Sequence, residues 1–288
     1  MTQLDEFESR FKSAAKPVFH FEPVTIKNIM IVIDQSGDHS RDYVEKIEKF
    51  LTVLNSGENA IETTLVTGDK FSSVDSLLEL VNEAQPDLIC TYRNLHTPAT
   101  EFPYSLGVYV DVLTQATTIP ILLLPHPKSL KDGDNVLRNS DRVMVVTDHL
   151  AGDARIVTYA ALFTQPEGEM TLAHVEDQNV YKRFVDIVSK IPSIDTDSAR
   201  ETIKQQLLKE PQDYIESCRT GLAVETELSI TVSASITMGD HLSDYRSIID
   251  NSEIDLLVLN TKDDDQLAMH GLAYPLSIEF RDLPLLLI

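Results

Sequence analysis

The chain has 288 residues, which is about the length of two ordinary domains. It carries 24 Lys and Arg against 46 Asp and Glu, so its formal net charge is −22 at pH 7. This balance argues against binding to nucleic acid or to an anionic membrane surface, because both need a basic patch. The hydrophobic fraction of 42% is enough for a buried core in each domain.

The cysteines and the amino terminus indicate the cellular compartment in which the protein is expected. Cys90 and Cys218 have no second thiol nearby in sequence, so we expect two reduced thiols rather than a structural bridge. Residues 1–16 mix acids with bases and contain no apolar signal-peptide core, and no stretch reaches about 18 apolar residues. The sequence therefore predicts a soluble, cytoplasmic protein without membrane insertion.

An amphipathic amino-terminal arm is predicted over residues 1–25. Leu4, Phe7 and Phe11 recur at helical spacing, and Pro17 ends the pattern. We expect this arm to pack against the body of the protein, with docking to a membrane or a partner as the alternative.

A first α/β domain is predicted over residues 26–125. Residues 29–33 are continuously apolar and end at Asp34, which is typical of a strand buried on both faces. Further strands are predicted at 61–66, 88–91 and 120–124, and helices at 44–54, 72–85 and 105–116. Strands that alternate with helices in this way predict a mostly parallel sheet.

A linker over residues 126–141 separates this domain from a second one over residues 142–288. Strands are predicted at 143–146, 170–175, 224–232, 256–259 and 284–288, and helices at 156–163, 180–220, 242–249 and 271–280. Pro192 and Pro211 are expected to interrupt the long helical region, because proline lacks the backbone N–H that an inner helical turn needs.

The two halves share landmarks that indicate a tandem repeat. Asp34 pairs with Asp148 at an offset of 114, Gly68 with Gly239 at 171, and Gly107 with Gly271 and Pro120 with Pro284 at 164. The increase from 114 to 171 leaves 57 additional residues in the second copy, about one strand and a broken helix. The second copy is therefore predicted to be complete, and the first to lack one β-α unit. Two unrelated α/β domains are the alternative.

The order of these motifs resembles the universal stress protein family, within the adenine-nucleotide α-hydrolase-like superfamily. The motifs are Ile33-Asp34-Gln35-Ser36, His174-Val175, Gly-Asp at 68–69 and 239–240, Asp-Leu at 87–88 and 255–256, and a glycine thirteen residues before Pro120 and before Pro284. The resemblance implies two tandem open, mostly parallel sheets flanked by helices. It also implies that the apolar terminal strands pair with each other as a pseudo-dimer, and a further homodimer remains open.

One departure from the family pattern bears on nucleotide binding. Nucleotide-binding members carry Gly-x-x-Gly, nine residues, then Gly-Ser or Gly-Thr, and these glycines let backbone N–H groups approach the phosphates. We place Tyr92, Leu95 and Val108 at these positions in the first copy, and Asn260, Asp263 and Leu272 in the second. Residues 263–265 are three aspartates, and each unit charge about 6 Å from a phosphate charge costs roughly 2–3 kcal/mol at an effective dielectric of about 20. Neither copy is therefore predicted to bind ATP in the family manner.

If a nucleotide site survives, its residues are expected at the carboxyl edges of the sheets, where open α/β folds bind ligands. The candidates are Asp34, Gly68, Gly107, Asp148, Gly239 and Gly271. The resemblance implies that the two aspartates face adenine, so AMP remains conceivable. Alternatively, the aspartates cap helices or turns and the glycines serve turn geometry.

No catalytic or metal-binding pattern is found in the sequence. The aspartates at 263–265 lack the spacing of a calcium loop, and the eight histidines show no zinc-binding spacing. There is no nucleophile elbow, P-loop or dinucleotide fingerprint.

We therefore predict a non-enzymatic, universal stress-type regulatory protein without cofactor, acting on an unknown protein partner or small ligand. The first alternative is a stress sensor or weak ATPase that binds ATP or AMP with Mg in the second domain. The second is a pair of phospho-acceptor domains, which the absence of an aspartate at residues 90–92 disfavours.

Overall fold

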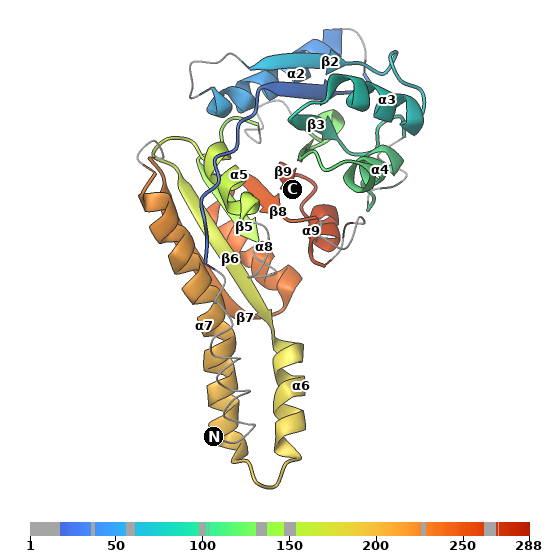
Figure 1. Ribbon diagram of the computed structural model, residues 1–288. Helices are drawn as coiled ribbons and strands as arrows, with labels where there is room; N and C mark the ends of the chain where they lie inside the picture. Colours follow the sequence, from blue (N-terminus) through green and yellow to red (C-terminus); the bar gives the residue numbers. More distant parts are fainter. Residues whose placement is uncertain are drawn as a thin grey trace.

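The structure is a computed structural model (Figure 1), and it describes residues 18–35, 38–55, 61–97, 102, 104–130, 137–146, 154–225, 229–261, 269 and 271–288, without the side chains of residues 38 and 39. The predictions made for the helical part of the arm, for Asp148 and for residues 263–265 lie outside the described residues.

The described strands form one nine-stranded sheet in the order β2-β1-β3-β4-β9-β8-β5-β6-β7. The strands are β1 Asn28–Val32, β2 Glu62–Val66, β3 Leu88–Tyr92, β4 Ile121–Leu124, β5 Arg142–Val146, β6 Glu169–Asp177, β7 Thr231–Gly239, β8 Leu256–Leu259 and β9 Leu285–Leu287. The mostly parallel α/β class is confirmed. The two predicted sheets are joined edge to edge, so the protein contains one mixed sheet instead.

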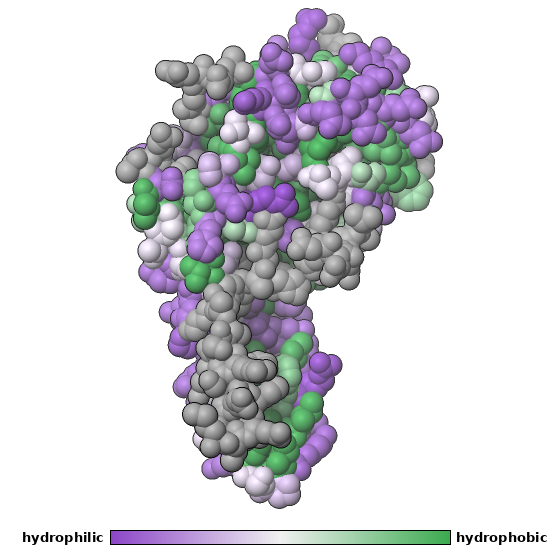
Figure 2. Space-filling view, viewed as in Figure 1, coloured by the Kyte–Doolittle hydropathy of each residue, from purple (hydrophilic) through white to green (hydrophobic). Residues whose placement is uncertain are grey.

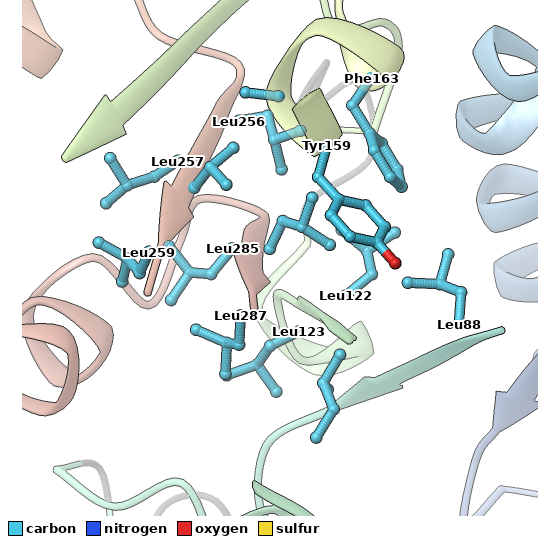
Figure 3. Packing of buried hydrophobic residues seen from close by; sticks show 14 of the residues in the cluster. Leu88, Leu122, Leu123, Tyr159, Phe163, Leu256, Leu257, Leu259, Leu285 and Leu287 are labelled. Carbon is cyan, nitrogen blue, oxygen red and sulfur yellow. The ribbon is translucent and has the colours of Figure 1, made fainter. Parts of the chain in front are cut away.

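The junction between the two strand sets is the antiparallel pair of β4 and β9, in which Leu122 faces Leu286. Every other described strand pair is parallel. Figure 3 shows the leucines of β4 and β9 lying together, with Tyr159 of α5 (Arg155–Phe163) beside Leu122. The paired leucines are fully buried, which explains why these strands read as continuous apolar runs.

Helices cover the sheet on both faces (Figure 1). Besides α5 they are α2 Asp38–Phe50, α3 Val74–Ala84, α4 Val108–Ala116, α6 Gln178–Ser189, α7 Thr196–Ala223, α8 His241–Ser252 and α9 Ala273–Glu279, with short 3-10 turns at Leu51–Leu54 and Pro127–Ser129. Ser73 begins α3 with a capping box: its hydroxyl accepts the Ser76 N–H, and the Ser76 hydroxyl accepts the Ser73 N–H.

Helices α6 and α7 form a hairpin that projects from the sheet (Figure 1). The side chains of Phe184, Ile187, Ile191 and Ile194, on α6 and the turn after it, are exposed. Figure 2 shows hydrophobic surface on this part of the molecule. The hairpin therefore carries exposed apolar side chains that do not belong to the core.

The two strand sets differ by one strand. In the first set β2 lies next to β1, whereas in the second β6 lies next to β5 and β7 lies beyond it. Gly68 follows β2 and Gly239 ends β7, so the two glycines match in sequence but not in space.

Two expectations for the second half were wrong. The strand expected from Val224 begins at Thr231, because Val224 forms the carboxyl end of α7. Pro211 does not interrupt α7, which continues through it. Pro211, Tyr214 and Ile215 are buried, so tertiary packing outweighs the hydrogen bond that proline removes. Pro192 does lie in the turn between α6 and α7, as expected.

Candidate functional site

Asp34 follows β1 at the carboxyl edge of the sheet, and its carboxylate is held by two donors from the same chain. The Tyr92 hydroxyl donates to one carboxylate oxygen, and the His96 backbone N–H donates to the other at 2.8 Å. In return, the Asp34 N–H donates to the Tyr92 hydroxyl oxygen at 3.1 Å. Both oxygens of the acid that the family resemblance places at the adenine end therefore already accept a hydrogen bond.

Tyr92 sits in a buried aromatic environment. Its side chain is 0% exposed, and its ring meets Tyr43 and His126 edge-on at centroid distances of 5.7 and 5.0 Å. Burial, followed by the hydrogen bond to Asp34, raises the pKa of Tyr92 well above its usual value, so the phenol stays protonated at neutral pH. Burial also lowers the pKa of His126, which favours the neutral ring.

The turn after β3 takes the place of the expected glycine loop, but not as the sequence predicted. Tyr92 and Leu95, which we placed at the lost glycines, are buried and do not have positive φ. The left-handed positions are Asn94 at φ 58° and His96 at φ 56°. Asn tolerates this conformation better than most residues. The turn therefore keeps a glycine-like backbone without glycine.

Gly68 and Gly107 are held by close backbone contacts. A Cβ on Gly68 would overlap the Asp34 carbonyl oxygen and lie 2.9 Å from its carbonyl carbon. Gly107 has φ +86°, and a Cβ there would lie 2.8 Å from the Cα of Asn94. The structure thus brings Asp34, Gly68 and Gly107 to one edge, where neighbouring protein fills the space beside both glycines.

A second group of rings lies next to the His96 turn. Phe71 meets His96 at 4.7 Å and Tyr109 at 5.5 Å, and His96 lies 5.5 Å from Tyr109. Phe71 and Tyr109 are buried. Sequence reasoning missed this cluster because its members are far apart in the chain and share no motif.

Of the candidate residues in the second strand set, the structure describes Gly239 and Gly271. Gly239 ends β7, and a Cβ there would overlap the carboxylate of Asp244. The Asp240 carboxylate accepts the Ser243 N–H at 3.1 Å and begins α8, so hydrogen bonds lower the pKa of Asp240. Gly271 has φ 58° just before α9. For Gly239 the geometry matches the turn alternative, and Asp240, which was not among the candidates, caps α8.

Two kinds of feature are absent from the ranges that the structure describes. Among them no group of three or more His, Cys, Asp or Glu could hold a metal ion. None of the helices in these ranges combines the length and the apolar character needed to cross a membrane.

The fold is a mostly parallel, nine-stranded α/β sheet. We compared the chain with known protein families, curated proteins and solved structures. No protein-family model matches the chain, and no curated protein matches it. Similar solved structures include a putative universal stress protein from Pseudomonas aeruginosa UCBPP-PA14, with 12% identity and a TM-score of 0.48 over 91% of this chain and 93% of that one. A universal stress protein from Archaeoglobus fulgidus DSM 4304 has 16% identity and a TM-score of 0.46 over 91% of this chain and 85% of that one.

The hypothetical protein MJ0577 matches at 17% identity and a TM-score of 0.40, over 52% of this chain and 95% of that one. The chain is thus similar to solved universal stress protein structures, as its motifs predict. Since the identities lie below 25% and the TM-scores below 0.5, the ligand and the activity have to be argued from the site itself.

Proposed function

We propose that this protein is a non-enzymatic, universal stress-type regulatory protein of the cytoplasm that does not bind ATP in the family manner. It needs no cofactor and acts by binding a protein partner or a small ligand. The observation that carries this proposal is the carboxylate of Asp34. We call it closed because each of its oxygens already accepts a hydrogen bond, one from Tyr92 and one from His96.

An adenine amino group that binds Asp34 would have to share the carboxylate with these donors or displace one of them, because each carboxylate oxygen already accepts one hydrogen bond. A hydrogen bond to a charged group stabilises by about 1.5–3 kcal/mol, and a buried donor left without a partner costs about 1–3 kcal/mol more. The amino group of adenine could replace one donor, but the buried Tyr92 hydroxyl would lose its acceptor. The first strand set therefore favours its own internal bonds over a base.

For the second strand set the proposal rests on the sequence, because Asp148 and residues 263–265 lie outside the described residues. The three aspartates at 263–265 repel phosphates, as argued above. The exposed apolar side chains on α6 and in the turn after it support the partner-binding part of the proposal. Large apolar patches on soluble proteins commonly mark interaction surfaces.

The pairing of β4 with β9 supports an internal assembly. In the family that the motifs resemble, the terminal strand pairs across a dimer. Here both terminal strands are used within one chain, and we propose that this internal pairing takes the place of that dimer contact. Apolar edge strands are seldom left open, so this pairing also removes two edges prone to aggregation.

Isothermal titration calorimetry of the full chain with ATP and Mg, and with AMP, tests the proposal. We expect no binding in the micromolar range, and no phosphate release in a parallel hydrolysis assay. Micromolar binding that Asp34→Asn abolishes would contradict the closed first site. Micromolar binding that survives this variant would favour a nucleotide sensor in the second half.

A further inference from the structure

Arg93 is the first residue after β3, and two of its three guanidinium nitrogens are buried without a hydrogen-bond partner. Its side chain is 5% exposed, and its Nε and Nη2 atoms are fully buried and donate to no acceptor. Nearly all buried polar groups in native proteins have a partner, and an exception calls for a specific explanation such as a bound ion or water. The free-energy cost is larger for a guanidinium than for a neutral polar group, because a full charge is moved from water into a medium of low dielectric.

Arg93 lies at the junction between the two strand sets. The carboxyl end of β3 is near that of β4, because these strands are parallel. Strand β9 runs antiparallel to β4, so the residues just before β9 reach the same edge. Arg281 and Asp282 belong to that turn, and both interact electrostatically with Arg93.

The described charges around Arg93 leave its guanidinium positive. The pKa of Arg93 is lowered to about 10, first by burial and second by the positive charge of Arg281, while Asp282 acts in the opposite direction. The guanidinium is therefore still charged at neutral pH. Asp282 forms no ion pair with Arg93 among the described residues.

A second arginine that acts electrostatically on a buried guanidinium is unexpected in this protein. With 46 acidic residues in the chain, a carboxylate would be the ordinary partner for a buried guanidinium. The charge of a second guanidinium, that of Arg281, also acts on Arg93, and Arg281 lies over the ring of Tyr104, with 5.1 Å between the Arg281 Cζ and the ring centroid. This arrangement suits an acceptor that comes from outside the chain.

We propose that Arg93 and Arg281 bind a small oxyanion of the phosphate class at the junction of the two strand sets. The planar fork of a guanidinium matches the oxygen spacing of phosphate and allows two parallel hydrogen bonds. Each strand set contributes one arginine, so a bound anion strengthens the contact between the sets. This site is separate from Asp34 and does not depend on the function proposed above.

The test is thermal unfolding of the full chain across a series of inorganic phosphate concentrations, with ionic strength held constant by chloride. We expect a saturable rise in Tm for the unmodified protein and at least a tenfold weaker apparent affinity for Arg93→Met. The matched control is Arg219→Met, which removes an exposed arginine that pairs with Glu216 on α7. This control should respond to phosphate as the unmodified protein does.

A Tm that does not depend on phosphate, or an Arg93→Met variant that keeps the full response, would overturn the proposal. Arg93→Met should fold, since replacing a buried unpaired charge by an apolar side chain of similar volume is often neutral or stabilising. If it does not fold, Arg281→Met gives the same readout, and an unchanged phosphate response in that variant would also overturn the proposal.

A nucleotide and free phosphate share this chemistry, and the two sources can be separated. AMP and ATP that bind no tighter than inorganic phosphate indicate that free oxyanion is the ligand. ATP that binds at least tenfold tighter, with the gain lost in Arg93→Met, overturns free phosphate as the ligand. Nucleotide binding that Asp34→Asn abolishes but Arg93→Met retains contradicts the function proposed above and leaves the oxyanion site intact.

Discussion

Replacing Tyr92 with Phe removes the interaction that closes Asp34. The variant keeps the ring that packs on Tyr43 and His126 but removes the hydroxyl. It takes a donor from the Asp34 carboxylate and an acceptor from the Asp34 N–H. The Tyr92 hydroxyl also has a hydrogen bond with the Gln35 backbone, which the variant removes as well.

The expected loss follows from the kind of hydrogen bond that is removed. A bond to a charged group contributes about 1.5–3 kcal/mol, and a buried N–H without a partner costs about 1–3 kcal/mol. Because the Asp34 side chain is only partly buried, water can replace part of what is lost. We expect the free energy of unfolding to fall by about 2–3 kcal/mol, which corresponds to a Tm lowered by roughly 4–10 °C.

Tyr43→Phe is the matched control for this measurement. Tyr43 is also buried, but its hydroxyl donates to a neutral acceptor, the Pro125 carbonyl oxygen, at 2.7 Å. Such a bond contributes about 1 kcal/mol. Urea unfolding followed by circular dichroism should therefore place Tyr92→Phe below Tyr43→Phe by about 1–2 kcal/mol. Equal losses would show that the carboxylate at Asp34 adds nothing, and the argument for a closed site would fail.

The pH dependence provides a second check on the same bond. The pKa of Tyr92 is raised in the folded protein, so the unfolded chain releases the phenolic proton first as the pH rises. The stabilisation is fully present below the ordinary tyrosine pKa of about 10 and is lost above it. The difference between the unmodified protein and Tyr92→Phe should therefore shrink above about pH 10. A difference that stays constant there would contradict the assignment.

Three further predictions follow from burial and packing. Gly68→Ala should lower the free energy of unfolding by several kcal/mol, about the size of a strained backbone contact. Gly221→Ala should lower it less, because the added Cβ would meet the Phe19 side chain closely and not backbone. Similar urea midpoints for the two variants would refute this. Burial raises the pKa of Cys90 well above its usual value and that of Cys218 to about 12. Neither thiol should therefore react with a disulfide reagent until the protein unfolds. Fast labelling of the native protein would contradict this prediction. Leu286→Ala should lower the free energy of unfolding by about 2–5 kcal/mol, and a loss under 1 kcal/mol would mean that the junction of β4 and β9 contributes little.

Much of the fold could be predicted because buried strands leave a local signal. The apolar runs that became β1, β3 and β8 predict strands on their own, and a parallel sheet follows from their alternation with helices. The same local signal gave a wrong start for the strand at Val224, because the first of the alternating apolar residues belongs to the end of α7. Pro211 was misread because its tolerance depends on packing that the sequence does not display.

The site was less predictable because its decisive contacts join distant residues. Tyr92 bonds to Asp34 across 58 positions, and no motif relates them. Counting from a family pattern placed Tyr92 in a loop where glycines had been lost, whereas it is the last residue of β3 and points into the site. The left-handed turn lies further on, at Asn94 and His96.

The strand order explains why the first carboxyl edge is closed. Because β2 lies directly beside β1, the connection from β2 to α3 carries Gly68 against the Asp34 backbone and Phe71 against His96. In the second set the neighbour of β5 is β6, and α6 begins at the residue after β6, so no such connection reaches that edge. The two edges therefore cannot be closed by the same contacts. Any nucleotide that binds weakly should do so with at most one molecule per chain, and a calorimetric stoichiometry of two would refute the link between strand order and closure.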